Sequence, residues 1–187
     1  MAAEAGADAV GLVFFAGSPR CVCAETARAI VAALPPFVSA VGLFVDEEPA
    51  RVRQVADFCG LDLLQLHGDE PPEGCSFPPR RVIKAIRVKT AASLQALDDY
   101  AVSAILLDAW APGSYGGTGE RFDWNLAAGL ARQRRIVLAG GLTPDNVAEA
   151  VRTVRPWAVD VSSGVEAAPG RKDAAKLAAF IRAAKGV

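Results

Sequence analysis

The chain has 187 residues, of which 52% are hydrophobic and 22% are charged, and its formal net charge is −1. The length predicts one domain over residues 1–187, and the charge gives no reason to expect nucleic acid or an anionic membrane as a partner. Because the longest apolar runs are too short to span a bilayer, we expect a cytoplasmic protein without a membrane partner.

Short apolar runs alternate along the chain with segments of helical periodicity. We predict strands at Ala7–Phe14, Ala40–Val45, Leu61–Leu66, Val82–Val88, Ala104–Asp108, Ile136–Ala139 and Val159–Ser162. We predict helices at Ala24–Leu34, Pro49–Phe58, Ala91–Asp98, Trp124–Arg132, Pro144–Arg152 and Asp173–Ala184. The connection Asp69–Arg81 is too rich in proline for a full helix. Ahead of the first strand, Ala2–Ala5 is typical of a last helical turn that stops at Gly6.

The alternation of strand and helix predicts parallel strands, and the nearly continuous apolar runs indicate a sheet covered on both faces. An open doubly wound sheet and a closed barrel both fit this pattern. The sequence contains neither G-x-G-x-x-G after a strand nor G-x-x-x-x-G-K-[ST], which favours the barrel. We therefore predict an α/β fold, the (β/α)8 TIM barrel, with about seven strands visible and the first β/α unit largely missing.

The chain has four cysteines, at Cys21, Cys23, Cys59 and Cys75, and one histidine, His67. No Cys-x-x-Cys pair occurs, so neither a zinc site nor any other metal is expected. We expect free thiols in a reducing compartment rather than a disulfide framework.

In β/α barrels the active site forms at the carboxyl ends of the strands. Asp108 follows three aliphatic residues, and partial desolvation of its carboxyl would suit a general acid, although an isolated Asp more often caps a turn. The glycine-rich stretch AWAPGSYGGTGERF that follows, which includes Gly117, favours the functional interpretation because a long loop of this kind is typical of a lid.

The last two strand ends, VLAGGLTPDN and VDVSSGVE, expose backbone in a recurring way. Gly140 and Gly141 precede Thr143 and Pro144, which are typical of a helix N-cap and first residue. The second strand end offers Ser162, Ser163 and Gly164. Since paired amide clusters after the seventh and eighth barrel strands form a recurrent phosphate site, the two ends together predict phosphate binding.

Three further side chains lie at strand ends. Arg20, in FFAGSPR, is a candidate ligand-binding cation or a solvated surface arginine. His67, in LLQLHGDE, could orient a substrate or be satisfied within the structure. Asp160 is predicted within the last strand, where an inward carboxylate would need a partner; it could orient a ligand hydroxyl or bond to neighbouring amides.

These motifs occur together in one family. The segments GADAVGLVF, SPR, VGLFVD, LLQLHGDE, VIKAIRV, LLDAWAPGSYGGTGERFDW, LAGGLTPDNV and VDVSSGVEAAPGRKD resemble the N-(5'-phosphoribosyl)anthranilate isomerases of tryptophan biosynthesis, in order and through nearly the whole chain. The resemblance implies a (β/α)8 enzyme that converts an aminoaldose phosphate into an aminoketose phosphate by an Amadori rearrangement. It implies no metal or organic cofactor, and it implies a phosphorylated small molecule as the partner.

The resemblance also implies roles for individual residues. Asp108 matches the general acid, and Arg20 matches the arginine that receives the anthranilate carboxylate. The phosphate-binding and other substrate-binding positions correspond to Gly117, Gly140, Gly141, Ser163, Gly164, Asp160 and His67.

The resemblance implies a cysteine general base in a motif like K-I-C-G, and this motif does not occur in the sequence. We expect it to belong to the first β/α unit, which would precede Met1. Cys21 and Cys23 are poor substitutes, because a base must lie within hydrogen-bond reach of one particular proton. A non-catalytic phosphate-ligand binder, or a barrel completed by a partner strand, is the alternative, while an indole-glycerol-phosphate synthase fits less well. Both a monomer and a homodimer agree with the sequence.

Overall fold

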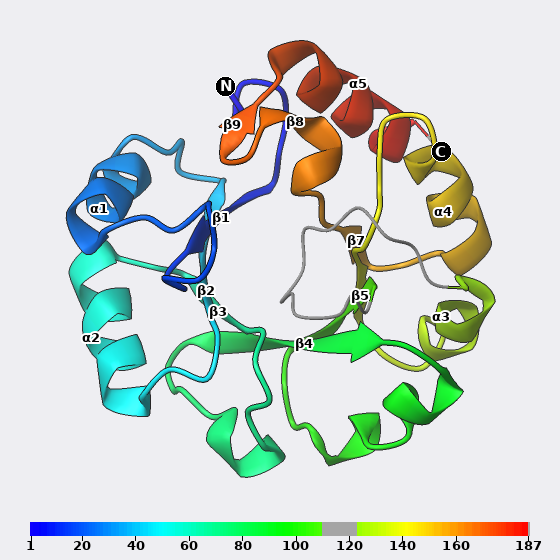
Figure 1. Cartoon of the computed structure of the whole chain (residues 1–187), viewed down its shortest axis with the longest axis horizontal. Helices are drawn as coiled ribbons and strands as arrows, with labels where there is room; N and C mark the ends of the chain where they lie inside the picture. Colours follow the sequence, from blue (N-terminus) through cyan, green and yellow to red (C-terminus); the bar gives the residue numbers. More distant parts are fainter. Residues whose placement is uncertain (110–122, 187) are drawn as a thin grey trace. The chain divides into compact units, whose positions relative to one another are not determined.

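The computed structural model describes residues 1–109 and 123–186 (Figure 1). The chain divides into two compact units, one of Met1–Lys84 with Tyr100–Ser103 and one of Ala85–Asp99 with Ala104–Val187. Strand β4 (Arg81–Val88) contributes its first half to the first unit and its second half to the second. The expectation of one domain over residues 1–187 stays a prediction.

The first unit alternates parallel strands with helices, as predicted. Its strands are β1 (Ala9–Val13), β2 (Ser39–Phe44), β3 (Leu63–Leu66) and the beginning of β4, paired in chain order. Its helices are α1 (Ala24–Ala32) and α2 (Pro49–Cys59). Pro49 opens α2 because a first-turn residue needs no N–H donor, and Gly60 ends the helix at φ +72°.

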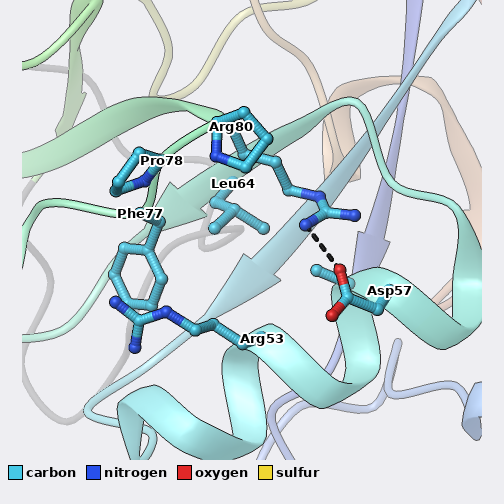
Figure 2. A pocket seen from close by; sticks show the side chains of 8 residues that line it. Arg53, Asp57, Leu64, Phe77, Pro78 and Arg80 are labelled. Carbon is cyan, nitrogen blue, oxygen red and sulfur yellow. Dashed lines mark hydrogen bonds and ion pairs between the residues drawn. The ribbon is translucent and has the colours of Figure 1, made fainter.

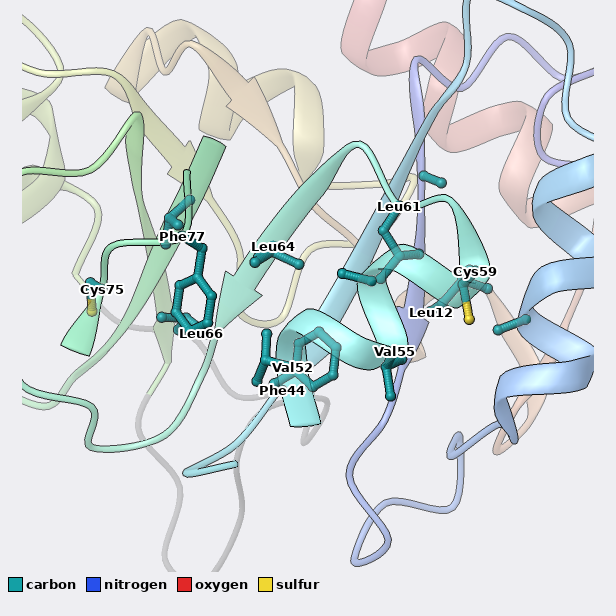
Figure 3. Close-up of a cluster of buried hydrophobic side chains, with 14 residues drawn as sticks. Leu12, Phe44, Val52, Val55, Cys59, Leu61, Leu64, Leu66, Cys75 and Phe77 are labelled. Atoms are coloured by element: carbon teal, nitrogen blue, oxygen red, sulfur yellow. The ribbon is translucent and has the colours of Figure 1, made fainter. Parts of the chain in front are cut away.

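The apolar core of the first unit lies between its strands and these two helices (Figure 3). The strands contribute Leu12, Phe44, Leu64 and Leu66, and the helices contribute Ala27, Val52, Val55, Ala56 and Cys59. Phe44 stacks on Phe14 with ring centroids 5.1 Å apart. Burial from both sides explains why these strands are apolar at nearly every position.

The second unit contains the remaining parallel strands, β5 (Ala104–Ala109), β6 (Ile136–Leu138) and β7 (Ala158–Val159). Its helices are α3 (Asn125–Leu130), α4 (Val147–Val154) and α5 (Ala174–Lys185). Sequence reasoning did not foresee the antiparallel hairpin of β8 (Glu166–Ala168) and β9 (Arg171–Lys172). Among the described residues, seven strands hydrogen-bond in chain order, so all seven predicted strands are present.

The predicted helix Ala91–Asp98 is wrong. The segment forms two short 3-10 turns, η2 (Ala91–Leu94) and η3 (Leu97–Asp99). The Ser93 hydroxyl accepts hydrogen bonds from the Lys89 and Thr90 N–H groups at 3.2 and 3.4 Å, which closes the first turn tightly. Within the two turns only Leu97 is buried, so no apolar face of helical length is available to stabilise a longer helix.

Two further predicted boundaries are wrong. Helix α4 begins at Val147 rather than at Pro144, because Asn146, not Thr143, is its N-cap. The last predicted strand, Val159–Ser162, is the two-residue β7, since the backbone leaves the extended region at Ser162 with φ −118° and ψ −86°.

Two expectations about the connections are confirmed. The proline-rich segment between β3 and β4 contains only the 3-10 turn η1 (Pro72–Gly74). In the segment ahead of β1, the Gly6 N–H donates to Ala3 O at 3.0 Å and the Ala7 N–H donates to Ala2 O at 3.1 Å. With Gly6 at φ +96°, this is the hydrogen-bond pattern of a helix C-terminus closed by glycine. No helix in the described part of the chain is both long enough and apolar enough to cross a membrane.

Candidate functional site

Asp108 lies at the carboxyl end of β5 and is only 5% exposed, so the expected burial of this carboxyl is confirmed. Its Oδ1 accepts a hydrogen bond from the Ala109 N–H at 2.9 Å. The preceding residues Ile105, Leu106 and Leu107 are fully buried, which holds the strand end in place. The arrangement presents one carboxyl group, largely shielded from water, at the end of a rigid strand.

The loop after β6 runs close to this carboxyl. Gly140 has φ +81°, and a Cβ built on it would lie 3.0 Å from Asp108 Oδ1 and 2.4 Å from the Ala109 nitrogen. Gly141 has φ +62°. Two left-handed residues in succession, the first of them with no room for a Cβ, explain why the sequence has a glycine pair here.

Asn146 fixes the shape of this loop, and sequence reasoning missed it. Its Nδ2 donates to Gly141 O at 2.9 Å, and its Oδ1 accepts from the Thr143 N–H at 2.8 Å. The residue is buried, with 6% of its surface exposed. The Asn at the end of the TPDN stretch could have been recognised as the helix N-cap from its residue type.

The loop after β7 contacts the loop after β6 through backbone atoms. A Cβ built on Gly164 would lie 1.9 Å from Leu142 O, so only glycine permits this approach. Ser163 and Gly164 belong to the 3-10 turn η4 (Ser163–Val165), which begins directly after Ser162.

One small cavity of the second unit brings several of the predicted site residues together. It is lined by Asp108, Ala139, Gly140, Gly141, Leu142, Asp160, Val161, Ser162, Ser163 and Gly164. Since glycine has no side chain to shield its N–H, the two loops present backbone amide groups beside a buried carboxyl. Gly117 and the rest of the predicted lid lie outside the described residues.

Asp160 differs from expectation in its environment. It follows β7 instead of lying within a strand, and it is exposed. Its N–H donates to Leu138 O at 2.8 Å, which aligns the chain beside the end of β6. The expected penalty for an inward, desolvated carboxylate therefore does not apply to Asp160.

Arg20 lies in the first unit, in the loop that follows β1. The Cys21 backbone forms a parallel bridge with Val13, and the Val22 N–H donates to Val13 O at 2.9 Å. The half-buried Arg20 is therefore held next to the carboxyl end of β1. This is the strand end from which the sequence predicts a ligand-binding cation.

His67 follows β3 and is 4% exposed. The Gln65 side chain, on the same face of the strand two residues earlier, lies with Nε2 3.0 Å from His67 Nδ1. This contact orients the His67 ring. Gln65 is a positioning residue that the alternation of side chains along QLH could have indicated.

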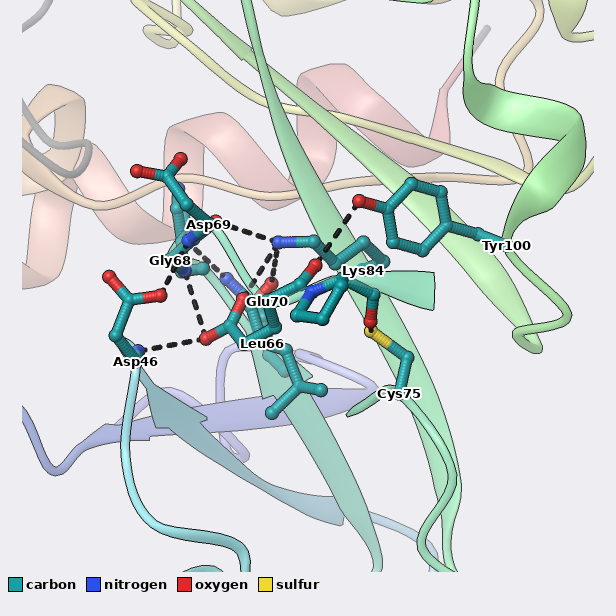
Figure 4. Close-up of polar contacts among 11 residues, drawn as sticks. Asp46, Leu66, Gly68, Asp69, Glu70, Cys75, Lys84 and Tyr100 are labelled. Carbon is teal, nitrogen blue, oxygen red and sulfur yellow. Dashed lines mark hydrogen bonds and ion pairs between the residues drawn. The ribbon is translucent and has the colours of Figure 1, made fainter. Parts of the chain in front are cut away.

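A buried ion pair joins Lys84 of β4 to Glu70 in the loop after β3 (Figure 4). Lys84 is 1% exposed, and its Nζ donates to Glu70 Oε2 at 2.8 Å, to Gly68 O at 2.8 Å and to Leu66 O at 3.3 Å. Glu70 Oε1 accepts from the N–H groups of Asp46 and Gly68 at 2.9 and 3.1 Å. These contacts connect the loops after β2 and β3, and sequence reasoning missed them because the partners are far apart in the chain.

Another cavity, of about 130 Å³, belongs to the first unit and lies at the amino end of β4 (Figure 2). Arg80 Nη1 donates to Asp57 Oδ1 at 2.7 Å, and the Arg53 guanidinium lies 4.8 Å from the Phe77 ring centroid. In β/α barrels this end of the strands contributes to stability, while the catalytic residues lie at the opposite end.

The four cysteines are free thiols, as expected. Cys59 and Cys75 are buried, and desolvation raises the pKa of both thiols. Cys21 and Cys23 are exposed, and Cys23 Sγ lies 3.1 Å from Thr26 Oγ1.

Comparison with known proteins gives consistent matches. The family described as N-(5'phosphoribosyl)anthranilate (PRA) isomerase matches residues 1–183. The N-(5'-phosphoribosyl)anthranilate isomerase of Pelobacter propionicus is 58% identical over 185 residues, which are 99% of this chain and 88% of that protein. The one from Geobacter sulfurreducens is 60% identical over 186 residues, 100% of this chain and 92% of the relative.

Solved structures agree. The crystal structure of phosphoribosyl anthranilate isomerase from Thermotoga maritima superposes with a TM-score of 0.91 at 45% identity, covering 100% of this chain and 92% of that one. A crystal structure of such an isomerase in complex with reduced 1-(o-carboxyphenylamino)-1-deoxyribulose 5-phosphate (rCdRP) gives a TM-score of 0.88 at 44% identity, covering 100% and 91%.

The fold is therefore of the α/β class, a (β/α)8 TIM-barrel type of protein with seven strands among the described residues. The chain belongs to the N-(5'-phosphoribosyl)anthranilate isomerase family.

Proposed function

We propose that this chain is an isomerase of tryptophan biosynthesis, which converts N-(5'-phosphoribosyl)anthranilate into 1-(2-carboxyphenylamino)-1-deoxyribulose 5-phosphate. The family membership supports the reaction. The observation that carries the assignment of residues is the cavity in which buried Asp108 lies beside the glycine and serine backbone of the two loops after β6 and β7.

In the proposed reaction, the Asp108 carboxyl donates a proton to the furanose ring oxygen. The ring then opens, and the anthranilate nitrogen forms a Schiff base with C1'. A general base, for which the sequence offers no K-I-C-G-like cysteine, then takes the C2' proton to give an enolamine, and transfer of a proton to C1' with loss of the enol O–H proton gives the aminoketose. A carboxyl group suits the first step because it can deliver a proton over hydrogen-bond distance, and Asp108 lies at the end of β5 in the lining of this cavity.

The amide groups of Gly140, Gly141, Ser163 and Gly164 are proposed to bind the phosphate, together with Gly117. Backbone N–H groups suit this role because they present partial positive charge without a titratable group. The close contact between Gly164 and Leu142 O supports the proposal, since it holds the two loops at a fixed separation.

Three further side chains are proposed to bind the substrate. The Arg20 guanidinium receives the anthranilate carboxylate in a bidentate geometry. His67, whose Nδ1 lies 3.0 Å from Gln65 Nε2, hydrogen-bonds to the substrate. Asp160, which lines the same cavity as Asp108, accepts a hydrogen bond from a sugar hydroxyl.

The setting of the protein is also a proposal. We place it in the cytoplasm, because the exposed free thiols Cys21 and Cys23 suit a reducing compartment. Its partner is the phosphorylated small molecule, with no nucleic acid and no membrane. It is a monomer or a homodimer, and one solved relative is described as monomers generated from a dimeric enzyme. We propose one domain over residues 1–187.

A second candidate function is ligand binding without turnover. It is favoured by one sequence observation, namely that no K-I-C-G-like motif with the general-base cysteine occurs. Two assays on the purified chain separate the candidates. The isomerase should consume the fluorescent substrate and bind rCdRP, whereas a binder would saturate with rCdRP and leave the substrate unchanged. Failure to bind rCdRP would contradict both candidates.

A further inference from the structure

Lys172, in β9 of the hairpin, reaches back to the loop that follows β7. Its Nζ donates a hydrogen bond to Ser162 O at 2.9 Å. Ser162 lines the same cavity as Asp108 and is followed directly by Ser163, one of the proposed phosphate-binding residues. Lys172 itself is not among the residues that line this cavity.

The hairpin holds the ammonium group in position. Glu166 is the cross-strand partner of Lys172, and its Oε1 lies 3.2 Å from Lys172 Nζ. The same oxygen accepts the Gly170 N–H at 3.3 Å, so one carboxylate, 5% exposed, connects the cation to the hairpin turn. Because both ends of the side chain are fixed, Lys172 loses little further freedom when it binds the Ser162 carbonyl.

The geometry of the peptide unit gives this contact a consequence for the site. The Ser162 carbonyl and the Ser163 N–H belong to the same planar trans peptide, so they point in opposite directions. A donor that fixes the carbonyl on one side therefore fixes the direction of the N–H on the other side. An ammonium at the carbonyl oxygen also polarises the amide, which makes its N–H a stronger donor.

We propose that Lys172 is a positioning residue for phosphate binding, acting through the Ser162–Ser163 peptide and not by contact with the ligand. This inference rests on the proposed function of the two loops as the phosphate site. It assigns a task to the RKD end of the VDVSSGVEAAPGRKD motif, which the proposed catalytic and binding roles leave unexplained.

The test measures the dissociation constant of rCdRP, so its readout does not depend on turnover. Lys172→Met removes the donor while keeping the length of the side chain, and we expect binding about tenfold weaker, the effect of one charge-assisted hydrogen bond. Lys172→Arg restores a donor and should stay within about threefold of the unsubstituted chain.

Lys176→Met is the matched control. Lys176 is exposed, and its Nζ donates to Glu166 O at 3.1 Å, on the same hairpin but away from the Ser162 carbonyl. It should leave the rCdRP dissociation constant within about twofold, because this exposed ammonium bonds to Glu166 O and exposed charges contribute little. Equal weakening by the two methionine variants would overturn the inference, since a general loss of positive charge would then suffice.

Competition by inorganic phosphate distinguishes a failure of the role of Lys172 from a failure of the proposed phosphate site. Phosphate should displace rCdRP from the unsubstituted chain, and Lys172→Met should raise its inhibition constant about tenfold. If phosphate does not compete at all, the phosphate site itself is misplaced. If it competes equally with both forms, only the role of Lys172 is wrong.

If Lys172→Met does not unfold cooperatively, Glu166→Gln provides a second test of the inference. Glu166→Gln keeps the side-chain shape but removes the charge that anchors the ammonium group. We expect rCdRP binding about threefold weaker, and an unchanged dissociation constant would contradict the inference.

Discussion

Gly140 lies with its α-carbon against the Asp108 carboxyl, so that a methyl group at Gly140 would sit 3.0 Å from Asp108 Oδ1. The same methyl group would lie 2.4 Å from the Ala109 nitrogen, and a backbone atom cannot rotate away as a side chain can. The residue also has φ +81°, which disfavours any L-residue other than glycine.

Gly140→Ala is therefore expected to lower the free energy of unfolding by about 1–3 kcal/mol and to weaken rCdRP binding. Urea unfolding and ligand titration measure the two effects. Gly129→Ala is the control, because Gly129 lies in α3 with nothing within 4 Å of the added methyl. That variant should gain about 0.5–1 kcal/mol, and equal losses from both changes would contradict the steric argument.

Asp108→Asn should abolish turnover with only a small loss of rCdRP affinity. The amide matches the carboxyl in shape but cannot deliver a proton, and general acid catalysis contributes about 10²–10⁴-fold to a rate. Steady-state assays of the anthranilate substrate measure kcat, and titration with rCdRP reports the binding separately. A kcat close to that of the unsubstituted chain would refute the assignment of the acid.

Arg20→Ala should chiefly raise KM, by about tenfold, because the proposed contact of the guanidinium with the anthranilate carboxylate would exist in the ground state and transition state alike. Arg51→Ala serves as the comparison. Arg51 lies on the exposed surface of α2, where its Nη1 donates to Gln54 Oε1 at 2.8 Å. Unchanged KM in Arg20→Ala, or a rise of the same size in Arg51→Ala, would show that the carboxylate binds elsewhere.

Glu70→Gln should destabilise the first unit on the order of 3 kcal/mol, since it leaves the Lys84 ammonium buried without a counter-charge. The Lys84 side chain is 2% exposed and that of Glu70 is 11% exposed. Thermal or urea unfolding measures the loss. For contrast, Asp98 is 97% exposed and lies 3.3 Å from Arg134 Nη1, so Asp98→Asn should change stability by less than about 1 kcal/mol. Similar values for the two variants would contradict the role of burial.

Besides Cys59, burial raises the pKa of two further groups of the first unit, so stability should fall in alkaline solution. The Cys75 thiol, which donates to Pro71 O at 3.4 Å, has its pKa raised above 9.0, and the Tyr100 phenol, which donates to Glu70 O at 3.1 Å, has its pKa raised above 10.0. The folded chain therefore holds these protons more tightly than the unfolded chain.

Below about pH 9, the ordinary pKa of a cysteine thiol, the two groups leave stability unaffected. As the pH rises from there through their folded-state pKa values, the free energy of unfolding decreases. Urea unfolding between pH 7 and pH 11 measures the decrease, and Cys75→Ala should make it shallower. A free energy of unfolding that stays level or increases over this range would disprove the linkage.

The order of strands and helices could be predicted from the sequence because most of the seven parallel strands are largely apolar, as in β5, where burial is nearly complete. The site residue Asp108 could be found in the same way, as the first polar residue after such a run. The prediction failed where local side-chain hydrogen bonds decide the backbone, as at Ser93 and Asn146.

Contacts between distant parts of the chain could not be predicted. Lys84 stands in an apolar strand and by itself gives no indication of its partner, because Glu70 precedes it by 14 residues and faces it only after β3 and β4 pair. The contact between Lys172 and Ser162 depends on a hairpin that was not predicted, although the Pro169–Gly170 pair at its tip is a turn signal.

The backbone contact between Gly164 and Leu142 O has a consequence for protein engineering. Loops of β/α proteins are often treated as modules that can be exchanged one at a time between relatives to alter ligand preference. Here the loop after β6 supplies the carbonyl and the loop after β7 supplies the glycine that fits against it. A graft that replaces either loop alone must reproduce this fit, so the two should be transplanted as a pair.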